Sequence, residues 1–420
     1  MSDTTTVSET GTQPSSQAAG YLLDKFGIYA ALGGLLLAAW FHQLVIVILL
    51  SLVLSAAGLA RLWSRFSLVG VHCQRQLSEQ RAFPGESIEV TLRAANRKLL
   101  PLPWLKVDDE IPDGFAPGVS LTPSRPGFSF LTKTAALLWY SRASWRHQLY
   151  CHKRGYFPLG PITVTSGDIF GFYPRSKTEP LIDHVIVYPK IYPITHLGIP
   201  SLFPLGETRA ERRIFEDPTR TIGIRDYSPH DALKRIHWKA SARRQNLQVK
   251  VYEPTTTLKA AVFLAIDSYP RDKTTAGEFE LGISTAASVA NYLTERKSAV
   301  GLFVNSRLVD SSQPARIPPA SGAGQLVGIL ESLAKVTRSA SGPFEDFLDS
   351  ERRGLPWGTT LVFILSHPSP SLVRLLTSLA ENGHKLVVLR TGDDEISPFG
   401  PAVACHRIRN PGDLTQVKRA

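Results

Sequence analysis

The sequence predicts a multidomain protein in which an N-terminal transmembrane α-hairpin precedes an antiparallel β-sandwich and a doubly wound α/β domain. Three observations predict this order. The stretch 27–60 contains no charged residue; short alternating apolar segments separated by Gly and Pro follow it; and from residue 258 apolar runs alternate with helical patterns. A chain of 420 residues is also too long for one ordinary core.

We expect five parts along the chain. They are a disordered tail over 1–22, a two-helix transmembrane hairpin over 23–65, the β-sandwich over 66–195, a basic segment over 196–257 and the α/β domain over 258–420. The three cysteines (Cys73, Cys151 and Cys405) are far apart and form no CxxC pair, so neither a disulfide framework nor a cysteine zinc site is indicated. This cysteine usage favours cytoplasmic exposure.

The uncharged stretch predicts a membrane anchor. A single helix over it would be roughly 50 Å long, whereas the hydrocarbon core of a bilayer is only about 30 Å thick. Two spans that turn near Trp40–Gln43 fit better. Lys25 precedes the hairpin and several arginines follow it, so the positive-inside rule predicts a multi-pass plasma-membrane protein with both termini and its soluble domains in the cytoplasm. A buried helical hairpin of a soluble protein is the alternative.

The next part has the pattern of short strands. The run Ser87–Arg93 alternates polar and apolar residues, follows the turn at Pro84–Glu86, and is typical of a half-buried strand. Similar runs occur at His147–Tyr150, Ile162–Thr165 and His184–Tyr188. Because helical periodicity is scarce between them, we expect an antiparallel sandwich that acts as a spacer or adaptor.

A basic segment follows the sandwich. Between Arg220 and Lys250 eight Lys or Arg face two Asp, a net charge of +6 out of +11 for the chain. Ser228 is a suitable N-cap, and the pattern predicts one helix from Pro229 to about Arg244. Leu233, Ile236 and Ala240 would form its apolar stripe.

On another face of this predicted helix, Asp231, Arg235, Lys239 and Arg243 recur every fourth residue. Such a row suits an acidic partner, a phosphate or a membrane surface, although a solvated face with ion pairs such as Asp231–Arg235 is an equal alternative. No nucleophile stands at a spacing that would make His237 catalytic, so we expect it to be a hydrogen-bonded packing residue.

The same segment resembles the signature of the domain-of-unknown-function-58 family. The resemblance rests on Gly223, Arg225, Tyr227, Pro229, Asp231, Ile236, His237, Trp238, Lys239, Ser241, Ala242 and Arg243. One departure is His230, where the family usually has glycine. The resemblance implies a C-terminal domain similar to von Willebrand factor type A and association with a MoxR-type AAA+ ATPase. The residues expected to bind a partner or an anion are Arg225, Tyr227, Asp231, Arg235, His237, Trp238, Lys239 and Arg243.

The C-terminal part alternates strands and helices. Strands are expected at Ala260–Asp267, Ala299–Val304, Thr360–Leu365 and Lys385–Leu389, with helices near 279–297, 325–336 and 369–381. Ligands of such sheets lie at the carboxyl ends of the strands, which makes Asp267 the position to test. Metal-binding von Willebrand type A domains carry D-x-S-x-S there, but Asp267 is followed by Ser-Tyr-Pro-Arg. We therefore expect Asp267 to be a capping or turn residue, with a degenerate metal site as the alternative.

These observations predict a non-catalytic membrane adaptor, without a cofactor, that docks a cytoplasmic protein. One alternative is a hydrolase that uses His237 or Asp267. Another is a binder of anionic lipid or nucleic acid through the basic helix. Nucleic acid is not expected, because only Trp238 and Tyr227 are available to stack on bases and no reading motif accompanies them.

Overall fold

The computed structural model describes residues 25–117, 121–195, 216–229, 231, 233–254, 258–270, 276–356, 358–392, 399 and 403–415. The predicted tail over 1–22 and His230 lie outside these residues. The chain divides into two compact units, Met1–Tyr188 and Pro189–Ala420, and each is described by itself.

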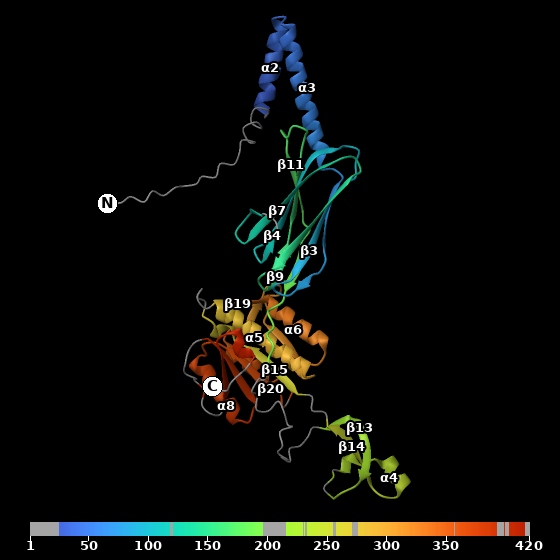
Figure 1. Ribbon diagram of the computed structural model, residues 1–420, viewed down its shortest axis with the longest axis vertical. Helices are drawn as coiled ribbons and strands as arrows, with labels where there is room; N and C mark the ends of the chain where they lie inside the picture. Colours follow the sequence, from blue (N-terminus) through green and yellow to red (C-terminus); the bar gives the residue numbers. More distant parts are fainter. Residues whose placement is uncertain are drawn as a thin grey trace, which may run out of the picture. The chain divides into compact units, whose positions relative to one another are not determined.

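The first unit begins with a helical hairpin (Figure 1). Helix α2 (Lys25–Trp40) and helix α3 (Leu44–Ser67) are separated by Phe41–Gln43, so the chain turns where the sequence predicted. Helix α3 is long and apolar enough to cross a membrane, whereas the apolar part of α2, Gly27–Trp40, is shorter. Apolar side chains such as Leu44 and Leu52 are about two-thirds exposed or more on α3. The second span remains a prediction.

The rest of the first unit is made of strands in three sheets around one hydrophobic core. The sheet orders are β1-β3-β8-β5, β11-β10-β4-β7-β6 and β2-β12-β9, and among these pairs only β2 and β12 are parallel. The strands are β1 (Val71–Leu77), β2 (Arg81–Ala82), β3 (Ser87–Asn96), β4 (Leu102–Pro112), β5 (Phe115–Pro117), β6 (Thr122–Pro123), β7 (Phe128–Leu137), β8 (Arg142–Cys151), β9 (Gly155–Leu159), β10 (Ile162–Ser166), β11 (Arg175–Glu179) and β12 (Asp183–Val187). Burial alternates along β3 as the sequence predicted, with Ile88, Val90 and Leu92 inside.

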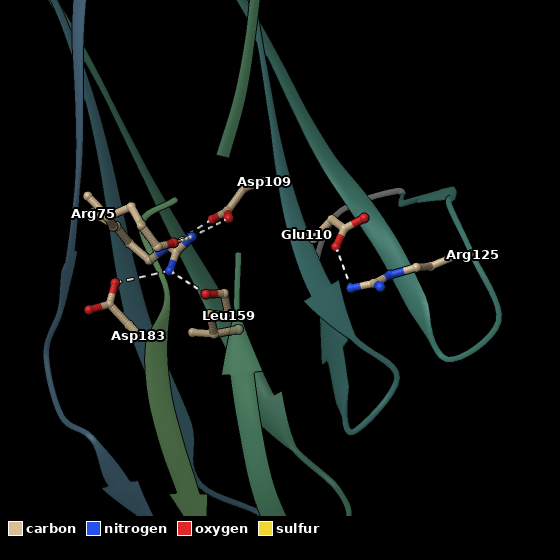
Figure 2. A network of polar contacts seen from close by, with 7 residues as sticks. Arg75, Asp109, Glu110, Arg125, Leu159 and Asp183 are labelled. Carbon is tan, nitrogen blue, oxygen red and sulfur yellow. Dashed lines mark hydrogen bonds and ion pairs between the residues drawn. The ribbon is translucent and has the colours of Figure 1, made fainter. Parts of the chain in front are cut away.

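A buried ionic network joins four strands of this unit, β1, β4, β9 and β12 (Figure 2). Arg75 donates from Nε and Nη2 to the two carboxylate oxygens of Asp109, at 3.1 and 2.5 Å. Its Nη1 donates to Asp183 Oδ2 at 3.0 Å and to the Leu159 carbonyl at 2.9 Å. Burial raises the pKa of Asp109, and the Arg75 guanidinium opposes that rise. Arg75 is one of the arginines that follow the hairpin in the sequence, and this network was not predicted.

The second unit contains a six-stranded sheet in the order β18-β16-β15-β20-β21-β22. Strands β15 (Lys259–Leu264), β16 (Ala299–Val304), β20 (Thr360–Leu365), β21 (Leu386–Thr391) and β22 (Ala404–Ile408) are parallel, and the edge strand β18 (Ala315–Ala320) is antiparallel. Counted along the chain, this order is 3-2-1-4-5-6, the order of a doubly wound sheet. A smaller sheet pairs β17 (Ser306–Leu308) with β19 (Val336–Ala340).

In the described part of the chain, four helices accompany the large sheet, and Figure 1 labels three of them, α5, α6 and α8. They are α5 (Ala276–Glu295), α6 (Ala323–Lys335), α7 (Phe344–Arg352) and α8 (Pro370–Glu381). Side chains of α7 and α8 share a core with Phe263 and Phe363 on one face, and α5 packs against β15, β16, β20 and β21. The predicted strands at 299–304 and 360–365 are confirmed, whereas β18, α7 and β22 were not predicted.

Candidate docking surface on the basic segment

The basic segment folds around an antiparallel strand pair. Strand β13 (Glu216–Asp226) pairs with β14 (Gln248–Pro254) so that Arg225 lies opposite Val249. Between them come a 3-10 turn η1 (Leu233–Arg235) and helix α4 (Trp238–Arg244). The predicted single helix from Pro229 to Arg244 is wrong. Its interior is interrupted because Ile236 forms a β-bridge with Val249, and both side chains are buried.

Arg225 and Asp231 form a bidentate pair at the start of this connection. Arg225 Nη1 and Nη2 donate to the two Asp231 carboxylate oxygens at 2.7 and 2.5 Å, and the Ser228 backbone N–H donates to Asp231 Oδ2 at 2.9 Å. Hydrogen bonding from Arg225, and then from Ser228, lowers the pKa of Asp231. The Asp231–Arg235 ion pair was named as one alternative; in the structure the bidentate partner of Asp231 is Arg225, and Arg235 contributes a weaker charge effect.

His237 and Ser241 hold helix α4 against β14. His237 is the N-cap residue of α4, and its ring Nδ1 accepts the Ala240 N–H at 3.1 Å. The backbone N–H of His237 donates to the Gln248 carbonyl at 2.8 Å. The buried Ser241 hydroxyl accepts the Gln248 N–H at 2.9 Å and donates to the His237 carbonyl at 3.1 Å. The expectation that His237 is a hydrogen-bonded structural residue agrees with these contacts. The roles of Ser241 and Gln248 were not predicted.

A pocket of about 250 Å³ lies beside α4. Its lining is mostly basic and polar: Ile224, His237, Lys239, Ala240, Arg243, Arg244 and Gln248. Gln248 is 1% exposed, and its side-chain oxygen has no hydrogen-bond partner among the residues that the structure describes. The side-chain nitrogen of Gln248 donates to Asp226. The pocket is therefore lined mainly by cationic side chains.

The other predicted binding residues surround this pocket or lie apart from it. Trp238 does not line the pocket and is 70% exposed at the start of α4. Leu233 is also 70% exposed, so the predicted apolar stripe of Leu233, Ile236 and Ala240 does not form. Tyr227 and Arg235 are half-buried and do not line the pocket. Since α4 starts at Trp238, only Lys239 and Arg243 of the predicted charged row share a helix face.

Asp267 lies in a 3-10 turn η2 (Ile266–Ser268) rather than at the end of the preceding strand, which stops at Leu264. Its Oδ1 accepts the side-chain N–H of Asn305 at 3.1 Å, and its Oδ2 accepts the backbone N–H of Phe344, the first residue of α7, at 2.9 Å. Asp267 thus caps a distant helix, in agreement with the predicted capping role. In the described part of the chain, no group of three or more His, Cys, Asp or Glu side chains is placed to hold a metal ion.

A second polar cluster follows β20 at the same sheet edge. The hydroxyl of Ser366 donates to Glu278 Oε2 at 2.9 Å and lies 2.9 Å from His367 Nδ1. The backbone N–H of Ser366 donates to the Ser268 hydroxyl at 3.0 Å. Because Ser366 is fully buried, its hydroxyl serves to link β20 and α5 and is not accessible as a nucleophile. The sequence signal for this cluster is its place after two adjacent parallel strands.

Comparison with known proteins finds similarity over this region. The family model described as "Protein of unknown function DUF58" matches residues 223–352. "Uncharacterized protein YeaD" of Bacillus subtilis (strain 168) is 23% identical over 252 residues, which are 58% of this chain and 58% of that protein. This chain therefore spans less than two thirds of that relative.

Solved structures give weaker similarity. The CARDB domain of the PF1109 protein from Pyrococcus furiosus is 13% identical with a TM-score of 0.20, covering 28% of this chain and 91% of that one. A cohesin module from Clostridium perfringens is 11% identical with a TM-score of 0.20, covering 28% and 96%. Scores this low support no argument on fold or function. The chain is thus similar to DUF58 proteins from Gly223, through the pocket and Asp267, to Arg352 in α7.

Proposed function

We propose that this protein is a non-catalytic membrane adaptor that docks a cytoplasmic protein through the surface of α4. The observation that carries the proposal is the exposed Trp238 beside the pocket formed by Lys239, Arg243 and Arg244. Tryptophan and arginine are enriched among residues that dominate binding energies at protein interfaces. The surplus of positive charge favours an acidic segment on the partner.

The contacts of His237 on this surface, and those of Asp267 in η2, support binding rather than catalysis. His237 Nδ1 is engaged by the Ala240 N–H, and both Asp267 oxygens accept hydrogen bonds from protein groups. These contacts hold each side chain in a structural role. The family resemblance of the signature adds a class of partner, a MoxR-type AAA+ ATPase.

The proposal includes the membrane topology and the domain types. In it, α2 and α3 both cross the plasma membrane, with both termini and the soluble domains in the cytoplasm; the first unit carries a β-sandwich; and the second carries a domain similar to von Willebrand factor type A. Lys25 and Arg61 at the outer ends of the hairpin support this orientation. The strand order 3-2-1-4-5-6 with an antiparallel edge strand supports the domain type.

The test is affinity capture of the full-length protein from its own membranes. One variant carries Trp238→Ala and a second carries Lys239→Ala with Arg243→Ala. Recovery of the partner should fall by at least about tenfold with each, because residues of this kind contribute roughly 2 kcal/mol or more when they anchor an interface. Arg225 is left intact, since it holds Asp231 and its loss would disturb the segment itself.

The matched control is Arg353→Ala with Lys385→Ala, which removes two exposed positive charges elsewhere in the same unit. An AAA+ ATPase recovered with the native protein and the control, and lost with both α4 variants, supports the proposal. Equal recovery with all forms contradicts the assigned surface. If vesicles of anionic lipid bind the native protein in a salt-dependent manner and no protein partner is captured, the adaptor proposal is wrong and the basic helix is a lipid binder.

A further inference from the structure

The end of the first unit that receives α3 carries exposed apolar side chains on three loops. We call these residues the loop patch: Leu99, Leu138, Trp139, Tyr140, Ile169 and Phe170, which are between 59% and 74% exposed. Large apolar residues gathered on adjacent loops indicate an interaction surface rather than scattered exposure. Trp and Tyr are the residues enriched at membrane–water interfaces.

Contacts with α3 fix the position, along the axis of α3, of the loop that holds Ile169 and Phe170. The Ser64 hydroxyl donates to the Tyr173 carbonyl at 2.5 Å, and the Arg61 guanidinium lies 5.7 Å from the centre of the Tyr173 ring. Arg61 directly follows the uncharged stretch 27–60. At a rise of about 1.5 Å per residue, Ser64 lies only about 6 Å beyond Ala60. The headgroup layer on each side of a bilayer is roughly 5–8 Å thick, so this loop is level with the headgroups if α3 spans the membrane.

The other two loops meet the last turn of α3. Lys98 Nζ donates to the Phe66 carbonyl at 2.6 Å and also to the Ser67 carbonyl, which satisfies two acceptors at the helix C-terminus. The Tyr140 N–H donates to the Lys98 carbonyl at 3.3 Å, so the turn between β7 and β8 lies against the loop after β3. Ser67 is about 10 Å along the helix from Ala60, just outside the headgroup layer.

The loop that carries Phe170 is built by a buried carboxylate. Asp168 is fully buried and accepts the backbone N–H of Phe170 at 3.0 Å and that of Tyr173 at 2.7 Å. Its own carbonyl accepts the Trp104 indole N–H at 2.9 Å. The loop is therefore organised by hydrogen bonds, and it leads into β11, which contacts α3 and is labelled near it in Figure 1.

Charge around the loop patch is of one sign. Exposed basic residues close to it are Arg61, Arg65, Arg97, Arg142 and Arg175, whereas Lys177, further along β11, is paired with Glu179. In the sequence stretches 61–77, 97–105, 137–147 and 166–176, the only acidic residue is the buried Asp168. A face that combines interfacial aromatic residues with arginines suits a bilayer surface containing anionic lipid.

From the continuity with α3, the aromatic content and the charge, we infer that the loop patch inserts into the headgroup layer of the membrane that α3 spans. The strands of the first unit then contact the bilayer surface directly and have a fixed orientation relative to it, rather than being connected to it through α3 alone. This inference rests on the membrane anchoring in the proposed function, and its occupant is anionic lipid.

The experiment uses full-length protein in nanodiscs of phosphatidylcholine and phosphatidylglycerol whose acyl chains are partly brominated. An environment-sensitive fluorophore is attached to a single cysteine introduced by Phe170→Cys. Two of the native cysteines stay unlabelled, because burial raises the pKa of Cys73 to about 12 and that of Cys151 to about 11 and both are inaccessible. Cys405→Ser removes the half-exposed third one.

Two further positions calibrate the result. Leu52→Cys labels the middle of α3, and Ile182→Cys labels an apolar residue of similar exposure, 51%, beside Asp183, which pairs with Arg75 in the interior of β1 and away from the loop patch. We expect bromolipid to quench the fluorophore at 170 strongly, somewhat less than at 52, and to leave that at 182 unchanged. Quenching at 170 should weaken when phosphatidylglycerol is left out or when Arg97→Gln and Arg142→Gln are added.

Each other pattern overturns a different statement. Quenching at 52 with none at 170 refutes the inference and leaves the anchor intact. No quenching at 52 refutes the anchor, and the inference with it. Equal quenching at 170 and 182 refutes the fixed orientation, because a part of the unit away from the loop patch would then contact lipid as well.

Discussion

Removing the guanidinium of the buried network while keeping its apolar volume, with Arg75→Met, should destabilise the first unit strongly. In the native protein, Arg75 and Asp109 have side chains that are 0% and 1% exposed, and three further hydrogen bonds of the network depend on the same guanidinium (Figure 2). The substitution leaves the Asp109 carboxylate buried without its counter-ion. Breaking a buried pair in this way costs about 3–5 kcal/mol.

The same view contains a matched control. Arg125 pairs with Glu110 at 2.9 Å, but the Arg125 side chain is 57% exposed (Figure 2). Arg125→Met should therefore cost no more than about 1 kcal/mol. The double variant Arg75→Met with Asp109→Leu should recover most of the loss, because replacing a whole buried pair with apolar residues is often close to neutral.

The pH dependence of the Arg75→Met effect has a definite sign. Burial raises the pKa of Asp109 above its unfolded value, and the variant removes the cation that opposes this rise. A raised folded-state pKa contributes stability that is complete below the unfolded pKa and is lost as the pH rises through the folded one. The loss of stability in Arg75→Met should therefore be largest at neutral pH and should shrink on acidification, as Asp109 becomes protonated.

Native-state hydrogen exchange of the paired amides of β3, β4 and β10, in detergent micelles, measures these differences. Amides that open only with the whole unit should exchange about two to four orders of magnitude faster in Arg75→Met at neutral pH. A change as small as that of Arg125→Met, or an effect that grows on acidification, would refute the argument from burial.

Three further substitutions test other parts of the structure. Gly160 has φ +96° and its missing Cβ would meet the Leu181 carbonyl, so Gly160→Ala should cost about 1–3 kcal/mol by the same exchange measurement; unchanged protection would contradict this. Leu52→Arg places a charge at the middle of α3 and should cost about 2.5–3.5 kcal/mol of insertion, seen as protein lost from the membrane fraction, whereas Leu52→Ala should stay there. Arg225→Gln should raise the pKa of Asp231 toward its usual range in an NMR titration, because Arg225 is the main cause of the lowered value. A lowered carboxyl pKa contributes stability that is present above the unfolded-state pKa and is lost as the pH falls through the folded-state pKa. The native segment should therefore stay folded to a lower pH than the Arg225→Gln variant. The same Asp231 pKa in both proteins would exclude the assigned pair.

Local patterns predicted the elements whose conformation depends on nearby residues. The turn near Trp40–Gln43 follows from two apolar lengths and one polar interruption, and strands 299–304 and 360–365 follow from continuous apolar runs buried on both faces. Strand β18 was not predicted because it contains Pro318 and Pro319, and proline is found in a strand mainly when the strand lies at a sheet edge. Its position at the edge is set by the order of the whole sheet, which no local pattern reveals.

Contacts between distant residues account for most of what the sequence analysis missed in the candidate site. The segment from Pro229 has the caps and periodicity of a helix. In the structure, Ile236 instead forms a β-bridge with Val249, which replaces helical hydrogen bonding at this position. Asn305 is a similar case. Its side chain accepts the Ile266 N–H at 2.8 Å and donates to Asp267, and both partners lie nearly forty residues away. A lone asparagine in a sequence gives no indication of such a role.

Some signature residues bond to other residues of the segment, and others expose their side chains on α4. Only the exposed residues are suitable for testing the proposed docking surface. Arg225, Asp231, His237 and Ser241 each hold the segment together through side-chain hydrogen bonds. Substituting them would disturb the fold of the segment, so loss of partner binding in such variants would say little about recognition. Trp238, by contrast, is 70% exposed, and Lys239 and Arg243 are exposed on one face of α4. Since folding of the segment does not require these exposed side chains, a binding defect in their variants reports on the partner itself.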